Sequence, residues 1–139
     1  MTRRAFLLMT ALAVATIAPV SAHHSFAMFE MGKEVTYKGT VIKWAWQNPH
    51  VHIEVLIKAG KDVDPATVGN WDAEAASINI MSKQGWNRAS YKAGDQITLV
   101  GHPLRDGAKG FSVFYAIRPD GSKLFSDIAR PKVSGTPDK

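Results

Sequence analysis

The 139-residue chain contains no cysteine. This excludes disulfide bonds and thiolate metal sites, so any bound metal must use histidine, carboxylate, methionine or the chain terminus. The chain also lacks a Gly-x-Ser-x-Gly elbow, a phosphate-cradling glycine loop and carboxylates paired at a telling spacing. Hydrolytic and transferase chemistry is therefore unsupported, and a binding protein is favoured over an enzyme.

Acidic residues are in modest deficit, with 12 Asp and Glu against 17 Lys and Arg, for a net charge of +5. Part of the excess positive charge lies at the start of the chain, where Arg3 and Arg4 precede an apolar run over 5–18. Small residues follow this run up to Ala22. This pattern predicts a signal peptide that is cleaved after Ala22, because the run is too short to span a bilayer comfortably. Cleavage leaves a charge of about +3, which is too small to indicate nucleic-acid binding.

Residues 2–7 resemble a twin-arginine export signal, and the general secretory route fits equally well. Either route predicts a periplasmic or secreted protein with no stable membrane insertion after cleavage. We expect a signal peptide over 1–22, a segment leading into the barrel over 23–32, a β-barrel domain over 33–129 and a disordered polar tail over 130–139.

Apolar and polar residues alternate through most of the remaining chain, which is typical of half-buried strands. The apolar phase of the first strand changes between Gly39 and Ile42, which indicates a bend or bulge. A bent first strand, and a helix between the third and fourth strands, predict an all-β, five- to six-stranded, OB-like Greek-key barrel. An up-and-down or sandwich-like domain is the alternative. The expected strands are 34–46, 50–58, 70–76, 96–102, 111–118 and 123–125, with a helix over 77–84 capped by Ser77.

Two histidines follow the Asn48-Pro49 turn. Because strand side chains alternate, His50 and His52 share one face, roughly 6.5–7 Å apart, and Glu54 lies on the same face. Such a pair can aim two imidazoles at one metal, with Glu54 as a further ligand or as an acceptor that orients a ring. A solvated strand face is the alternative.

Three further histidines extend this metal hypothesis. Cleavage after Ala22 would place the α-amine and the imidazole of His23 together, with His24 beside them, and such nitrogen ligands suit Cu(II) first and Zn(II) second. Alternatively, the same segment only packs on the barrel through its phenylalanines. His102 ends the fourth strand, where it either meets His50 or His52 or remains a rim histidine.

The aromatic residues support a second hypothesis. Trp44 and Trp46 share one face of the first strand, where they could stack a small ligand or contact a periplasmic protein partner without a metal, with Glu54 nearby. The alternative for both rings is a place in the core. A third and weaker hypothesis is a copper-dependent redox enzyme with an N-terminal histidine site.

Several motifs are also similar to a known family. The chain resembles a family of small exported bacterial proteins that is known only as a domain of unknown function. The resemblance implies export and a compact β-barrel, and it supplies no activity. The motifs, which span nearly all of the expected mature chain, are Ala22-His23-His24-Ser25-Phe26-Ala27-Met28-Phe29, Gly39-Thr40-Val41, Asn48-Pro49-His50, Gly85-Trp86, Lys92-Ala93-Gly94-Asp95, His102-Pro103, Arg105-Asp106-Gly107 and Gly110.

Overall fold

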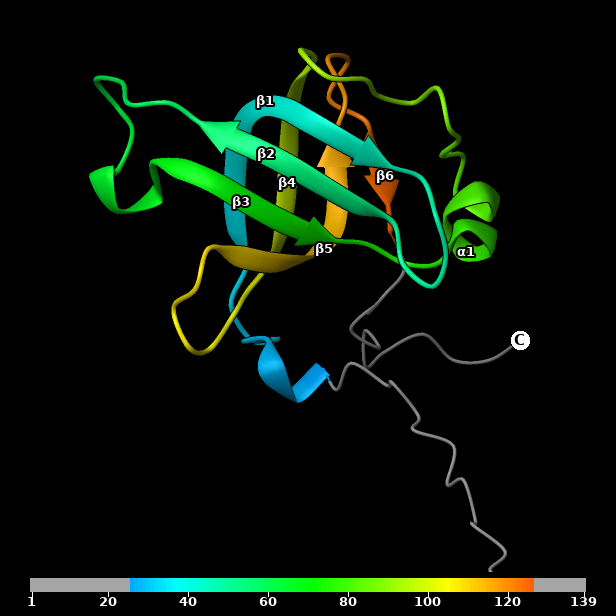
Figure 1. The fold of residues 1–139 in the computed structure, drawn as a ribbon, viewed down its shortest axis with the longest axis horizontal. Coiled ribbons are helices and arrows are strands. Elements are labelled where there is room, and N and C mark those ends of the chain that lie inside the picture. Colours follow the sequence, from blue (N-terminus) through cyan, green and yellow to red (C-terminus); the bar gives the residue numbers. More distant parts are fainter. Residues whose placement is uncertain (1–25, 127–139) are drawn as a thin grey trace, which may run out of the picture.

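The computed structural model describes residues 26–126, so the expected signal peptide (1–22) and tail (130–139) lie outside the described residues. The strands and the helix follow one another in the expected order (Figure 1). Within residues 26–126, no helix is long and apolar enough to cross a membrane. The elements are η1 (Phe26–Met28), β1 (Val35–Ala45), β2 (His52–Ile57), η2 (Pro65–Thr67), β3 (Gly69–Glu74), α1 (Ile78–Lys83), β4 (Gln96–Pro103), β5 (Gly110–Ile117) and β6 (Lys123–Phe125).

Five of the strands close into a barrel, and the sixth extends the sheet beyond it. The strand order is β3-β2-β1-β4-β5-β6, and an additional pairing joins β3 to β5. That closing pair is parallel, with Asp72 opposite Gly110 and Glu74 opposite Ser112, whereas the other pairs are antiparallel. Helix α1 follows β3 and buries Met81 in the core. This mixed barrel confirms the OB-like prediction over the sandwich-like and up-and-down alternatives.

Strand β1 belongs to both halves of the barrel because it bends. Its residues 35–40 pair with β4, and its residues 40–45 pair with β2. The register shifts between Val41 and Lys43, which places a bulge where the apolar phase changes. Just before it, a Cβ at Gly39 would lie 2.5 Å from the Leu56 carbonyl oxygen. The predicted bend is therefore confirmed, at a position that has no room for a side chain.

The interior is filled by one face of each strand. Val51, Ile53 and Val55 are fully buried, whereas the residues between them lie partly exposed on the outer face. Tyr37 of β1 is 2% exposed and stacks on Phe111 of β5, with ring centroids 3.8 Å apart. The alternation of β2 thus fixes which residues reach the outer surface.

The buried phenol of Tyr37 makes stability sensitive to alkaline pH. Burial raises the pKa of Tyr37 from 10.0 to about 12. Because the folded pKa exceeds the unfolded one, the neutral phenol stabilises the fold fully below pH 10, and this contribution is lost as pH rises to about 12. The loss in unfolding free energy is about 2–3 kcal/mol. Across this pH window, the free energy of unfolding measured in urea should fall less for Tyr37→Phe than for Tyr115→Phe or the wild type. An equal fall in all three proteins would contradict this role of Tyr37.

Candidate functional site

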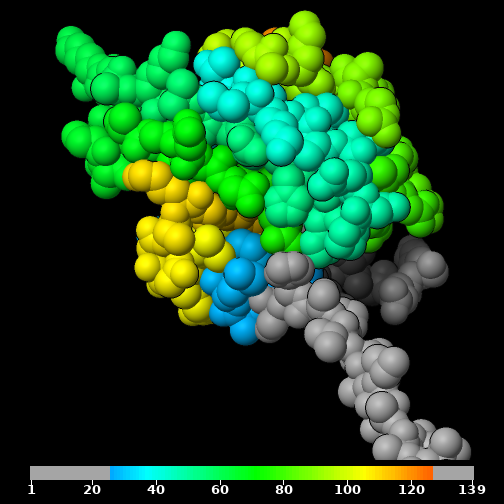
Figure 2. Space-filling model, viewed as in Figure 1, coloured from blue at the N-terminus to red at the C-terminus, as the bar shows by residue number. Residues whose placement is uncertain are grey.

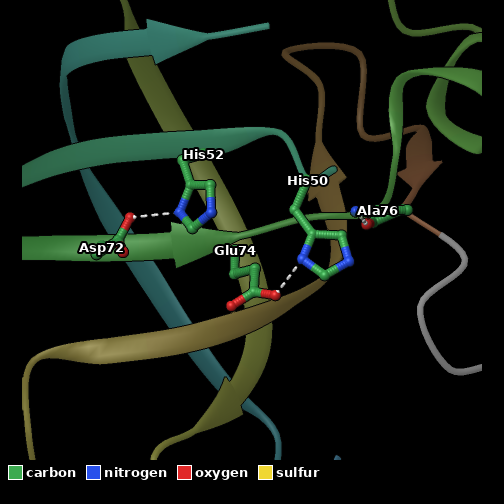
Figure 3. Close-up of polar contacts among 6 residues, drawn as sticks. His50, His52, Asp72, Glu74 and Ala76 are labelled. Atoms are coloured by element: carbon green, nitrogen blue, oxygen red, sulfur yellow. Dashed lines mark hydrogen bonds and ion pairs between the residues drawn. The ribbon is translucent and has the colours of Figure 1, made fainter. Parts of the chain in front are cut away.

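The outer face of β2 and β3 gathers imidazoles and carboxylates. In the ladder of this pair, His52 lies opposite Glu74. Just before β2 begins, the backbone continues this pairing, because Val51 N donates to the Ala76 carbonyl oxygen at 3.0 Å. Because Val51 points inward, His50 and His52 both lie on the outer face, beside the carboxylates of β3 (Figure 3). The sequence prediction that these two histidines share one face is confirmed.

Each histidine contacts one carboxylate, diagonally across the ladder. His50 Nδ1 lies 2.6 Å from Glu74 Oε1, and His52 Nδ1 lies 3.1 Å from Asp72 Oδ1 (Figure 3). An ionised carboxylate only accepts hydrogen bonds, so Nδ1–H donates in both pairs, and the lone pair of a neutral ring lies on Nε2. The His50–Glu74 side chains are 28% and 14% exposed, against 36% and 59% for His52–Asp72. The first pair is therefore better shielded from water and more firmly held.

The surroundings of His52 favour its protonated form. The hydrogen bond to Asp72 is the main cause that raises the pKa of His52, burial opposes it, and the negative charges of Asp72 and Glu74 add to it. A ligating imidazole must be neutral, so a proton competes with any metal at this ring. Binding at His52 should therefore weaken as pH falls.

Glu54 lies on the same outer face, as expected, but its contact is with a cation. Its Oε1 is 3.4 Å from Lys43 Nζ of β1. Together with His52 and Asp72, these two residues line an open pocket of about 370 Å³. The structure thus places Glu54 beside His52 without a contact to either imidazole.

His102 lies apart from the other two described histidines. It is 2% exposed, and its Nδ1 donates to the Lys33 carbonyl oxygen at 2.9 Å. Its Nε2 is buried and has no hydrogen-bond partner in the described part of the chain. His102 pairs with Ser112 of β5, and β5 separates it from β3. The structure does not bring His102 to His50 or His52.

The described residues do not complete a metal site by themselves. Within residues 26–126, no three His, Asp or Glu side chains form a group that could hold a metal ion. His23 and His24, the other predicted ligands, lie outside the described residues. His50 and His52 with their carboxylates therefore form, at most, half of a coordination sphere.

The chain enters the described region close to this face. The backbone N–H of Arg105 donates to the Met28 carbonyl oxygen at 3.0 Å, and Arg105 Nε donates to the Ala27 carbonyl oxygen at 2.9 Å. These contacts hold η1 on the β4–β5 loop. That loop in turn meets β3, where Asp72 N donates to the Lys109 carbonyl oxygen at 3.1 Å. In Figure 2 the first described residues, in blue, lie beside the yellow residues of the β4–β5 loop, on the same visible face as the green residues of β3.

The two tryptophans of the second hypothesis pack with other aromatic rings. Trp44 stacks on Trp46 and Trp86, with centroids 5.6 and 5.9 Å apart, and its Nε1–H donates to the Arg88 carbonyl oxygen at 3.0 Å. Trp46 is 9% exposed and belongs to the core, and Trp44 is half-buried against it. Their rings face one another and the interior.

Sequence reasoning missed Asp72 and Glu74. The signal was present, because both residues alternate with the buried Trp71 and Ala73 along a predicted strand. Pairing that strand with the histidine strand would have placed the carboxylates opposite the imidazoles. The strand partner, however, is a tertiary property that the local pattern does not contain.

Comparison with known proteins adds a family but no activity. No curated protein matched the chain. A family model matches residues 10–112, most of the sequence, and this match confirms the resemblance to an uncharacterised family. The chain therefore belongs to DUF6152, a family of unknown function.

Proposed function

We propose that this small β-barrel protein binds a transition-metal ion, copper first and zinc second, on the outer face of β2 and β3. The observation that carries the proposal is the pair of contacts from His50 Nδ1 to Glu74 and from His52 Nδ1 to Asp72. Metal-ligating histidines usually donate their second ring N–H to a carboxylate, which fixes the tautomer and raises ligand basicity. Both rings have this arrangement and would coordinate through Nε2.

The remaining ligands would come from the N-terminus. In the sequence His24 is two residues before Phe26, which begins η1, and η1 is held on the β4–β5 loop by Arg105. Processing after Ala22 would add the α-amine of His23. An amine and several imidazoles form a nitrogen-rich set that favours Cu(II) over other divalent ions. His102 is not included, because it is buried and donates from Nδ1 to the Lys33 carbonyl oxygen.

The test is a Cu²⁺ titration of the chain that begins at His23, against a competing chelator. The double variant His50→Ala/His52→Ala should weaken copper binding by about 100-fold or more, because each imidazole is a direct ligand. The double variant Asp72→Asn/Glu74→Gln should weaken copper binding by about 10- to 100-fold. Glu54→Gln is the matched control on the same face and should bind as the wild type does. Unchanged affinity in the double histidine variant would rule out the site.

A second measurement separates the two halves of the site. Placing the segment Gly-Ser-Gly-Ser before His23 takes the α-amine away from both histidines and removes the chelate ring of amine and imidazole, while leaving β2 intact. The electron paramagnetic resonance spectrum of bound Cu²⁺ should then show fewer coupled nitrogens than the chain that begins at His23. An identical spectrum would show that the amine is not a ligand.

Metal-independent ligand binding that is lost in Trp46→Ala would instead favour the aromatic hypothesis.

A further inference from the structure

A second cleft lies at the opposite end of β2 from the histidines. His50 precedes that strand, whereas Lys58 directly follows it. The cleft has a volume of about 650 Å³ and lies where the β1 bend, the start of β4 and the turn after β5 gather at one end of the barrel (Figure 1). This volume is typical of small-molecule sites. Its lining includes Lys38, Lys58, Arg118, Tyr91, Leu56 and Ile97.

The net charge of this cleft is positive. Lys38, Lys58 and Arg118 come from three different strands or strand ends, and none of them forms an ion pair within the described residues. The carboxylate in the lining, Asp95, is already paired, since Lys92 Nζ lies 2.9 Å from its Oδ1. The hydrogen bonds from Lys92 also lower the pKa of Asp95, so the pair persists. The three remaining cations therefore attract an anion.

The walls between these cations are apolar or already hydrogen-bonded. Leu56 and Ile117 are partly exposed and supply aliphatic surface, and Gln96 Nε2 donates to Thr40 Oγ1 at 2.9 Å. Gly39 and Thr40 line the cleft on the side of β1. Cations set among aliphatic walls suit a ligand that has both a charged group and an apolar body, rather than a bare inorganic ion.

Tyr91 shows that the cleft reaches the edge of the aromatic core. Its ring packs edge-on against Trp44 at 5.7 Å, and it is half-buried. Burial raises the pKa of Tyr91, the positive charge of Arg118 opposes this shift, and the negative charge of Asp95 adds to it. The phenol O–H of Tyr91 and the guanidinium of Arg118 both line the cleft, and both are hydrogen-bond donors suited to an oxyanion.

We propose that this cleft binds a small organic anion, whose carboxylate or phosphate group contacts Lys38, Lys58 and Arg118 and whose apolar part lies against Leu56 and Ile117. The proposal is independent of the metal site, because the two sites share no residue. Anion binding would occur with or without bound copper.

The test uses 4-phenylbutyrate as the probe in an NMR titration of ¹⁵N-labelled protein. The amides of Gly39, Gln96 and Arg118 should shift, with a dissociation constant of about 1 mM for a ligand of this size. The triple variant Lys38→Gln/Lys58→Gln/Arg118→Gln should bind about tenfold more weakly, because it loses three charge contacts.

Two controls make this outcome specific. Lys33→Gln/Lys61→Gln/Lys83→Gln removes the same total charge from outside the cleft and should bind as the wild type does. The cationic analogue 4-phenylbutylamine has the same apolar body and should not shift the cleft amides. The proposal is overturned if 4-phenylbutyrate leaves these amides unshifted, if the amine shifts them equally, or if both triple variants lose affinity alike.

Discussion

Gly39→Ala is expected to destabilise the barrel by about 3 kcal/mol or more, a large part of the stability of a small domain. The added Cβ would lie 2.5 Å from the Leu56 carbonyl oxygen and 2.6 Å from Val55 Cγ1. Backbone on the neighbouring strand cannot move aside as a flexible side chain would. The substitution therefore pushes β1 away from β2 at the point where β1 must also pair with β4.

Urea unfolding followed by circular dichroism measures this loss. Gly32→Ala is the matched control, because a Cβ at Gly32 meets nothing within 4 Å. It should unfold at the wild-type midpoint. A Gly39→Ala protein with the same midpoint as Gly32→Ala would show that the two strands tolerate a side chain at the bend.

Trp86→Ala is expected to cost about 4 kcal/mol, which is typical of removing a large buried aromatic side chain. Trp86 is 1% exposed, stacks on Trp44 at 5.9 Å, and donates from Nε1 to the Phe125 carbonyl oxygen at 2.8 Å. The substitution therefore leaves a cavity beside Trp44 and also removes a hydrogen bond that holds β6 to the segment after α1.

Trp86→Phe separates these two contributions. It keeps an aromatic ring in the core but cannot donate the hydrogen bond, so it should lose about 1–2 kcal/mol. Thermal unfolding followed by near-ultraviolet circular dichroism reports both stability and the stacked tryptophans. If Trp86→Ala lost no more stability than Trp86→Phe, the ring packing inferred for this end of the barrel would be wrong.

The fold could be predicted from the sequence because its signals are local. The alternation of Val51, Ile53 and Val55 identifies both a strand and its buried face. The phase change after Gly39 locates the bend, and Ser77 caps α1 as expected, with its side chain accepting from Ile80 N. Each of these features depends on a few neighbouring residues, so each is readable without knowing the rest of the structure.

The candidate site was only half predictable because its other half depends on register. His50 and His52 were identified from their spacing, but their contacts with Glu74 and Asp72 require the pairing of β2 with β3. The burial of His102 depends on a still more distant contact, with the Lys33 carbonyl oxygen. No local pattern at His102 indicates which segment covers it.

The segment before β1 shows the same limit. Phe29 is 5% exposed and bridges Leu104, whereas Phe26 is 49% exposed. Sequence reasoning treated the two phenylalanines alike, because both are apolar residues in a short stretch. Only the position of the β4–β5 loop distinguishes the ring that packs from the one that does not.

The parallel pairing of β3 with β5 has a consequence for how the chain folds. Asp72 and Gly110 are neighbours in this ladder although nearly forty residues separate them, so a large loop must be closed before the contact forms. Such non-local pairings make a domain of high contact order and favour slow folding. Until β5 is available, β3 presents an unpaired edge whose backbone groups can pair with another chain. Nascent or truncated chains that end before Phe111 should therefore be the aggregation-prone form of this protein, and β5 is the segment whose arrival removes that hazard.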